Sequence, residues 1–209
     1  MISILIDTST SNLTVSIINS KEVIYKYQET ILSDMSSKLL PIIDNGLKEH
    51  NLKLENIDKI FVVNGPGSFT GIRVGVTVAK TIAWALKKDI ISLSSLELIA
   101  TTNTSKKYIV SMIDARRGNA FAGIYDNNLN CIKEDKLISI EEISDLNSDY
   151  EFVSYDDIKL DNVIKPNIDV LKIINKHIND EGINPHNLNP NYLKLTEAEE
   201  SRENKLKND

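Results

Sequence analysis

The chain has 209 residues, of which 24 are basic and 30 acidic, and its net charge is −6. This length suffices for one large domain or two small lobes with a buried core. The acidic balance and an aromatic content of 6% argue against nucleic-acid binding by this chain alone, which needs cations for the phosphates and rings for the bases. A single cysteine, Cys131, excludes an internal disulfide and a cysteine-based zinc cluster, and fits a reducing cytoplasm.

The first thirty residues predict three strands. Residues 2–7 (ISILID) form a continuous apolar run, and residues 13–19 and 22–28 alternate between apolar and polar. Short polar segments separate the three runs, which is typical of an antiparallel meander. No basic segment precedes the first run, and no run reaches the ~18–20 apolar residues of a membrane span, so neither a signal peptide nor a membrane contact is expected.

Helical spacing begins at residues 35–49, where Met35, Leu39 and Ile43 fall on one side. The following elements are predicted, in chain order, to be a strand, a helix, a strand and a short helix: 59–63, 71–87, 89–93 and 94–103. The second half starts with a hairpin, whose strands are 108–114 and 120–126, and contains a further helix near 167–180.

This order of elements predicts an α/β fold of two related lobes. We place the boundary near residue 104, which gives an N-terminal lobe of residues 1–104 and a smaller C-terminal lobe of residues 105–209. The last stretch, residues 196–209, is nearly all polar and is expected to fray.

A glycine-rich turn, NGPGSFTGIR (residues 64–73), leads into the helix at 71–87. Gly65, Gly67 and Gly71 permit the close approach of a ligand or of another backbone segment. Ser68 or Thr70 can cap the helix, whose first-turn amides favour an anion. The spacing matches neither the P-loop nor the dinucleotide-binding pattern, so phosphate binding and tight packing without a ligand both remain open.

The helix at 71–87 is too apolar to cover a sheet with one side only. Its apolar residues span about 200° of the helical wheel, whereas one buried stripe needs roughly 100°. Four small residues, Gly71, Gly75, Ala79 and Ala83, recur every four positions and predict the close approach of another helix. Trp84 lies on the narrow polar strip, where it is either an interface residue or is covered by the second lobe.

Few residues are candidates for chemistry. His50, His177 and His186 are far apart and are interpreted as ordinary surface residues, and Cys131 has no recognisable base nearby. Asp7 ends a strand and precedes three hydroxyl residues, Thr8, Ser9 and Thr10, which suits either a metal–phosphate group or a hydrogen-bonded turn. A second set lies in the predicted hairpin turn and could either bind an anion or simply solvate the turn: Asp114, Arg116 and Arg117.

Six segments carry a resemblance to a known family: ILIDTSTSNLTVSI, SSKLLPIID, NGPGSFTGIRVGVTVAKTIA, SLSSLELIA, DARRGNAFAGIYD and PNYLKLTEAE. Their order and approximate spacing resemble the bacterial TsaB (YeaZ) family, within the glycoprotease-like group that also contains TsaD. The resemblance implies an ASKHA (actin/sugar-kinase/Hsp70-like) fold and a role in making threonylcarbamoyladenosine beside the anticodon of tRNA. In that system TsaD is the catalyst, TsaB is its non-catalytic partner, and the ATPase TsaE joins the complex. TsaD-type members carry a His-x-x-x-His metal site, which this sequence lacks.

The resemblance also implies where partners bind. It places an interface to TsaD, or to a second copy, on the helices at 35–49 and 71–87. The residues it assigns to this interface are Met35, Leu39, Ile43, Gly71, Val74, Gly75, Val78, Ala79 and Ile82. Met35 departs from the family, which often has a histidine there. Contact with tRNA is expected only through the complex, in the cytoplasm.

The first loop departs from kinases of this fold, which have a glycine where this chain has Ser9. We therefore expect a degenerate nucleotide loop, with no cofactor beyond weak binding of Mg-ATP or ADP. Its residues are Asp7, Thr8, Ser9, Thr10, Gly65 and Gly67. The alternative is a small Mg-ATP-dependent phosphotransferase that uses Asp7 as its metal carboxylate. Protease is the older label of the group, but this sequence has no metal-binding or nucleophile pattern that would support that activity.

Overall fold

The computed structural model describes residues 1–31, 33–144, 146 and 149–193. The predicted polar tail at 196–209 lies outside the described residues.

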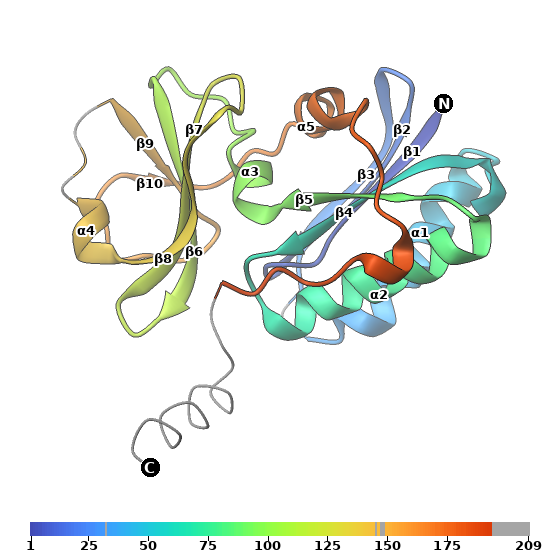
Figure 1. Cartoon of the computed structure of the whole chain (residues 1–209), viewed down its shortest axis with the longest axis horizontal. Coiled ribbons are helices and arrows are strands. Elements are labelled where there is room, and N and C mark those ends of the chain that lie inside the picture. Colours follow the sequence, from blue (N-terminus) through green and yellow to red (C-terminus); the bar gives the residue numbers. More distant parts are fainter. Residues whose placement is uncertain (32, 145, 147–148, 194–209) are drawn as a thin grey trace, which may run out of the picture.

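The described chain forms two five-stranded sheets with the same topology (Figure 1). The first sheet has the order β3-β2-β1-β4-β5, built from β1 (Ile2–Asp7), β2 (Asn12–Asn19), β3 (Glu22–Thr30), β4 (Ile57–Gly65) and β5 (Ile90–Ser94). The second has the order β10-β9-β6-β7-β8, built from β6 (Tyr108–Arg116), β7 (Asn119–Asp126), β8 (Cys131–Ser139), β9 (Tyr150–Val153) and β10 (Val163–Ile164). In both, a three-stranded antiparallel meander is extended by two parallel strands. The two lobes are therefore related, as predicted.

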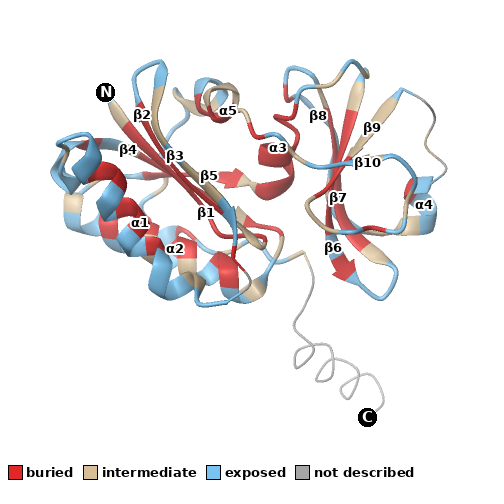
Figure 2. Ribbon diagram, turned by 180° about the vertical axis from the view of Figure 1, so that it is seen from behind, coloured by how far each residue is buried: buried red, intermediate tan, exposed pale blue. Residues whose placement is uncertain are grey.

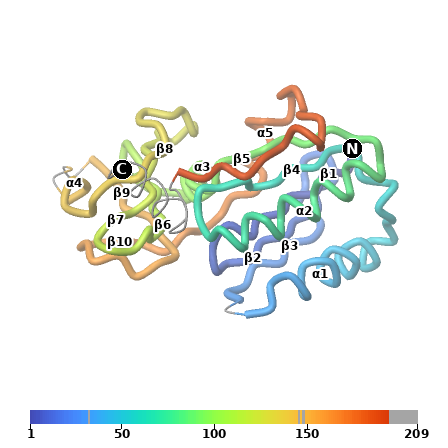
Figure 3. The backbone as a smooth tube through the Cα atoms, turned by 60° about the horizontal axis from the view of Figure 1, so that its bottom comes forward, coloured from blue at the N-terminus to red at the C-terminus, as the bar shows by residue number. Residues whose placement is uncertain are grey.

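The helices cover the first sheet more fully than the second. α1 (Met35–Glu49) and α2 (Phe69–Leu86) lie together on one side of the first sheet (Figures 1 and 3). The shorter helices are η1 (Leu54–Asn56), α3 (Ser95–Ile99), α4 (Ile140–Ser144), α5 (Val170–His177) and η2 (Pro185–Asn187). β8 carries no apolar alternation from which its extent could be predicted, because it is an edge strand whose residues are mostly polar and exposed.

Alternating side chains of β1 contribute to two different cores. Ile4 and Ile6 pack in the core under α1 and α2, whereas Leu5 points to the opposite side. On that side the two sheets share one apolar core, which includes Phe61 of the first sheet and Phe121 of the second. Figure 2 shows the buried residues of both sheets on either side of α3. The lobes are thus joined by packing and not only by their connecting segments.

The chain returns to the first sheet after β10. Ile183 forms an antiparallel bridge with Ile90 of β5, and Leu188 is buried in the core under α1 and α2. The predicted boundary near residue 104 lies between α3 and β6, but the residues that follow β10 are not confined to the second lobe.

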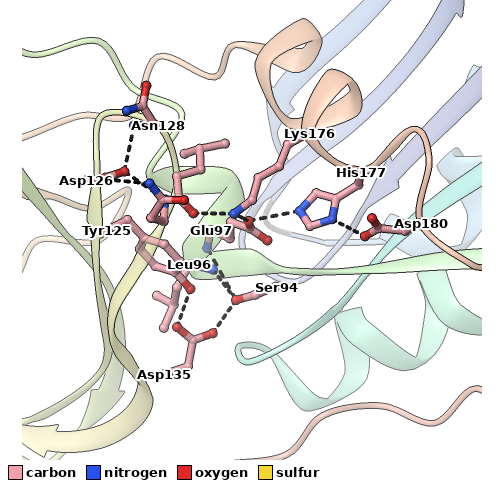
Figure 4. A network of polar contacts seen from close by, with 12 residues as sticks. Ser94, Leu96, Glu97, Tyr125, Asp126, Asn128, Asp135, Lys176, His177 and Asp180 are labelled. Carbon is pink, nitrogen blue, oxygen red and sulfur yellow. Dashed lines mark hydrogen bonds and ion pairs between the residues drawn. The ribbon is translucent and has the colours of Figure 1, made fainter.

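A polar network joins α3 and α5 where the two lobes meet (Figure 4). The imidazole of His177 lies between two carboxylates, with Nε2 3.0 Å from Glu97 Oε1 and Nδ1 2.6 Å from Asp180 Oδ2. Lys176 Nζ donates to the same Glu97 oxygen at 2.6 Å. Because carboxylates only accept hydrogen bonds, both contacts of His177 are satisfied only when its ring carries two protons. His177 is therefore not the ordinary surface residue that the sequence suggested.

The two partners shift each other's ionisation. The hydrogen bond to Glu97 raises the pKa of His177 although partial burial opposes it. Burial acts to raise the pKa of Glu97, but hydrogen bonds from His177 and Lys176 outweigh it, so that this pKa lies below its usual value. Protonated His177 thus holds α5 against α3.

This geometry predicts a pH-dependent contribution to stability. Because the folded pKa of His177 is raised above ~6.5, its contribution is complete below that pH and is lost as the pH rises through the folded pKa. We expect His177→Ala to lower the free energy of unfolding by about 1–2 kcal/mol at pH 6 and by clearly less at pH 9, in urea titrations. His186→Ala, at an exposed position, should show no such difference. An equal loss at both pH values would contradict the prediction.

Candidate functional site

A cleft of about 1020 Å³ opens between the lobes. Its walls include the loop after β1, the start of α2 and the β6–β7 turn, which contribute Ser9, Gly71 and Arg116 among others. Met35 and Val74 also line it, so α1 and α2 both reach the cleft with their N-terminal ends. β1 and β6 hold corresponding central positions in the two sheets, and the turn that follows each of them faces this cleft.

The glycine-rich turn is filled by the chain's own backbone. A Cβ atom added at Gly67 would lie 2.2 Å from the carbonyl oxygen of Ser9, and one at Gly65 would lie 2.5 Å from that of Asn191. Both glycines have positive φ, +149° at Gly67 and +120° at Gly65, which other residues rarely adopt. The amide of Ser68 donates to Ser9 O at 2.7 Å. These contacts are those of the tight-packing alternative, and Gly67 and Ser68 also line the cleft.

The loop after β1 is also closed by internal hydrogen bonds. Asp7 Oδ1 accepts from the amide and the hydroxyl of Ser9 at 2.8 and 2.7 Å. Thr8 Oγ1 donates to the carbonyl oxygen of Gly71 at 2.7 Å. Ser9 and Thr10 line the cleft, whereas Asp7 and Thr8 are buried behind them. Burial raises the pKa of Asp7 to about 6, although the hydrogen bonds from Ser9 lower it. This is the geometry of a hydrogen-bonded turn.

The first two small residues of the row on α2, Gly71 and Gly75, pack against the loop after β1. A Cβ atom at Gly71 would lie 2.1 Å from Thr8 O, and one at Gly75 would lie 2.3 Å from Thr8 Oγ1. Ala79 and Ala83 are fully buried in the core under the helices. The small residues let α2 approach the loop after β1, within the same lobe.

The predicted interface residues are mostly inside the lobe. Six of them are buried within this chain: Leu39, Ile43, Gly71, Gly75, Ala79 and Ile82. Three keep partial exposure: Met35, Val74 and Val78. The helical wheel gives the width of the apolar arc on α2 correctly, but the first sheet and α1 cover most of that arc. The large apolar side chains that α1 and α2 do expose are Leu40, at 55%, and Trp84, at 65%, so Trp84 is not covered by the second lobe.

The β6–β7 turn holds the second group of candidate residues. Arg116 and Arg117 both have positive φ, 64° and 54°, ahead of Gly118 at 76°. Asp114 Oδ1 accepts from the amide of Arg116 at 2.8 Å, and the amide of Asp114 donates to Asp156 Oδ2 at the same distance. Asp114 and Arg116 line the cleft. These hydrogen bonds stabilise the turn itself, which was one of the two alternatives for this group of residues, the other being anion binding.

Two searches of the described residues are negative. In that part of the chain no group of three or more His, Cys, Asp and Glu residues is placed to hold a metal ion. Likewise, no helix within the described ranges has the length and apolar character needed to cross a membrane.

Comparison with known proteins identifies the family. The profile of TsaD, described as tRNA N6-adenosine threonylcarbamoyltransferase, matches residues 20–179. The tRNA threonylcarbamoyladenosine biosynthesis protein TsaB of Buchnera aphidicola subsp. Schizaphis graminum is 31% identical over 147 residues, which cover 67% of this chain and 70% of that protein. The chain belongs to the TsaB family. TsaB of Bacillus subtilis is 37% identical over 121 residues, 57% of this chain and 53% of that protein. The chain thus spans about half the length of this curated relative.

Solved structures confirm the fold of this TsaB-family chain. YeaZ from Pseudomonas aeruginosa superposes with a TM-score of 0.78 at 20% identity, covering 92% of this chain and 99% of that one. A second structure from that organism, described as similar to peptidase YeaZ, gives 0.79 at 21% identity with the same coverage. Together with the repeated sheet topology, this confirms the predicted α/β fold of two lobes and shows that it is the fold of YeaZ.

The contact between α2 and Thr8 predicts that alanine at position 75 has an unusual effect on the stability of the fold. Replacing glycine by alanine inside a helix normally stabilises it by roughly 1 kcal/mol. Gly75→Ala should instead destabilise the fold by about 1–3 kcal/mol, because the new methyl group meets Thr8 Oγ1. Thermal and urea unfolding measure the change, and Thr77→Ala, at an exposed position of the same helix, is the control. A stabilised Gly75→Ala variant would show that α2 does not depend on this contact.

The buried Asp7 predicts a stabilising substitution. Its folded pKa of about 6 lies above the unfolded value of 3.8, so ionisation of Asp7 lowers stability as the pH rises between these values. Asn retains the Oδ1 acceptor for Ser9 without the buried charge. Asp7→Asn should therefore raise the free energy of unfolding by about 1–3 kcal/mol at pH 8 and change it little at pH 4. A loss of stability at pH 8 would contradict this account of the loop.

Proposed function

We propose that this protein is a non-catalytic partner of the threonylcarbamoyltransferase TsaD in the modification of tRNA adenosine next to the anticodon. The observation that carries the proposal is the family match, together with apolar side chains that α1 and α2 expose to solvent. In the wider proposal TsaE joins a larger complex, tRNA is contacted only through that complex, and the isolated chain forms a homodimer through the same helices.

The chemistry of the cleft supports a non-catalytic role. The glycine turn is filled by backbone atoms, and the hydroxyl and carboxylate groups of the first loop hydrogen-bond one another. Cys131, on the exposed edge strand β8, has its pKa raised by burial and by neighbouring carboxylates, which disfavours a thiolate nucleophile. The phosphotransferase alternative is not favoured, because Asp7 is buried behind the residues that line the cleft and its carboxylate accepts hydrogen bonds from Ser9.

The structure changes which residues should dock the partner. We define the docking surface as Met35, Leu40, Val74, Val78 and Trp84, which are exposed or half-buried on α1 and α2. An exposed tryptophan of this kind is a typical hot spot in protein–protein interfaces. Leu39 and Ala79, by contrast, are fully buried, so substitutions there test folding and not docking.

Reconstitution tests the proposal directly. We expect no tRNA threonylcarbamoylation by this protein alone, and activity of TsaD and TsaE from the same organism that depends on adding it. Trp84→Ala and Leu40→Glu should each weaken the complex with TsaD about tenfold or more, as measured by calorimetry, with little change in thermal stability. Ile132→Glu, at a position 47% exposed on β8 of the other lobe, is the matched control. Activity that did not require this protein would refute the proposed function.

A further inference from the structure

The end of the described chain forms a strap along α2. We define the strap as residues 183–193, which follow α5 and run beside α2 on the side away from α1 (Figure 3). Its first half is held by apolar burial, through the bridge of Ile183 to Ile90 and the buried side chain of Leu188. Its second half contacts the turn before α2 and the polar side of that helix, and its final residue, Leu193, packs against the core that the two sheets share.

Hydrogen bonds attach the middle of the strap. Lys80 Nζ donates to the carbonyl oxygen of Leu188 at 2.8 Å. Asn64 donates through Nδ2 to Asn189 O at 3.2 Å and accepts from the amide of Asn191 at 2.7 Å. Asn64 is the first residue of the glycine-rich turn and Lys80 lies on α2, so the strap is tied both to the turn and to the helix that follows it.

The last contact is an aromatic clamp made by Tyr192. Its ring stacks on Phe69 with centroids 4.5 Å apart, and its hydroxyl accepts from Arg73 Nε at 2.8 Å. The guanidinium of Arg73 lies 3.8 Å from the centroid of the Phe69 ring. Phe69 and Arg73 belong to the first turns of α2, and Tyr192 is 38% exposed. The clamp therefore adds little to the core, and what it fixes is the start of the helix.

We propose that Tyr192 is a positioning residue for partner binding, because it fixes through Phe69 and Arg73 the first turns of α2 and with them the cleft end of the docking surface. The inference rests on the proposed function. Val74 directly follows Arg73 and, like Tyr192, lines the cleft. α2 has no acidic residue in its first turn, and the cap bond from the Gly71 amide to Ser68 Oγ is 3.2 Å long. The loop after β1 holds the buried side of this helix start, and the clamp holds its exposed side through Phe69 and Arg73, where a helix end would otherwise fray.

The first test uses the isolated protein. Hydrogen–deuterium exchange of residues 72–74 should be about tenfold faster in Tyr192→Ala, because the stacking and the hydrogen bond are both lost. Tyr192→Phe keeps the ring and should restore most of the protection. Tyr150→Ala removes a ring whose centroid lies 5.2 Å from that of Tyr108 in the second lobe, and is the matched control. Unchanged exchange in Tyr192→Ala would show that the clamp does not hold the first turns of α2.

The second test measures partner binding in the reconstituted reaction. Tyr192→Ala should raise the concentration of this protein needed for half-maximal rate about tenfold, without lowering the rate at saturation, and Tyr192→Phe should restore it. Faster exchange with unchanged half-saturation would overturn the positioning role, while Trp84→Ala would still report on docking. If Trp84→Ala, Leu40→Glu and Tyr192→Ala all left half-saturation unchanged, the proposed docking surface itself would be wrong.

Discussion

The structure depends on one close contact, between the loop that follows β1 and the glycine turn that starts α2. The carbonyl oxygens of Thr8 and Ser9 occupy the space that Cβ atoms would fill at Gly71 and Gly67. Because backbone meets backbone, the separation of these segments is fixed more firmly than side-chain packing would fix it. The contact sets the position of α2 on the sheet and forms part of the cleft wall.

Periodicity predicted the first lobe well. The helical spacing of residues 35–49 reflects a helix with one buried face, so its pattern is written in the sequence. β2 alternates although both of its faces are buried, because small polar residues, Thr14 and Ser16, occupy one of them. β8 shows no such pattern because it is exposed at a sheet edge. The return of the chain to the first sheet also escaped prediction, since it depends on isolated contacts such as that of Ile183 with Ile90.

The candidate site was predicted as a set of residues but not as a geometry. Glycines that admit a ligand and glycines that admit backbone look identical in sequence, and only the position of Ser9 O against Gly67 distinguishes them. The helical wheel likewise gave the width of the apolar arc on α2 without showing which neighbours cover it. The role of His177 was missed because one of its two carboxylate partners is far away in the sequence. Asp180 is three residues away, but Glu97 is eighty.

The repeated sheets differ in one respect that governs stoichiometry. α2 connects β4 to β5 in the first lobe, whereas residues 154–162, which make the corresponding connection between β9 and β10, contain no helix and are all described. The described part of the chain therefore offers one helix of this kind and not two. In the proposed assembly through α1 and α2, a subunit with a single such face joins one neighbour through it, so this assembly would end at a closed pair instead of growing into a filament.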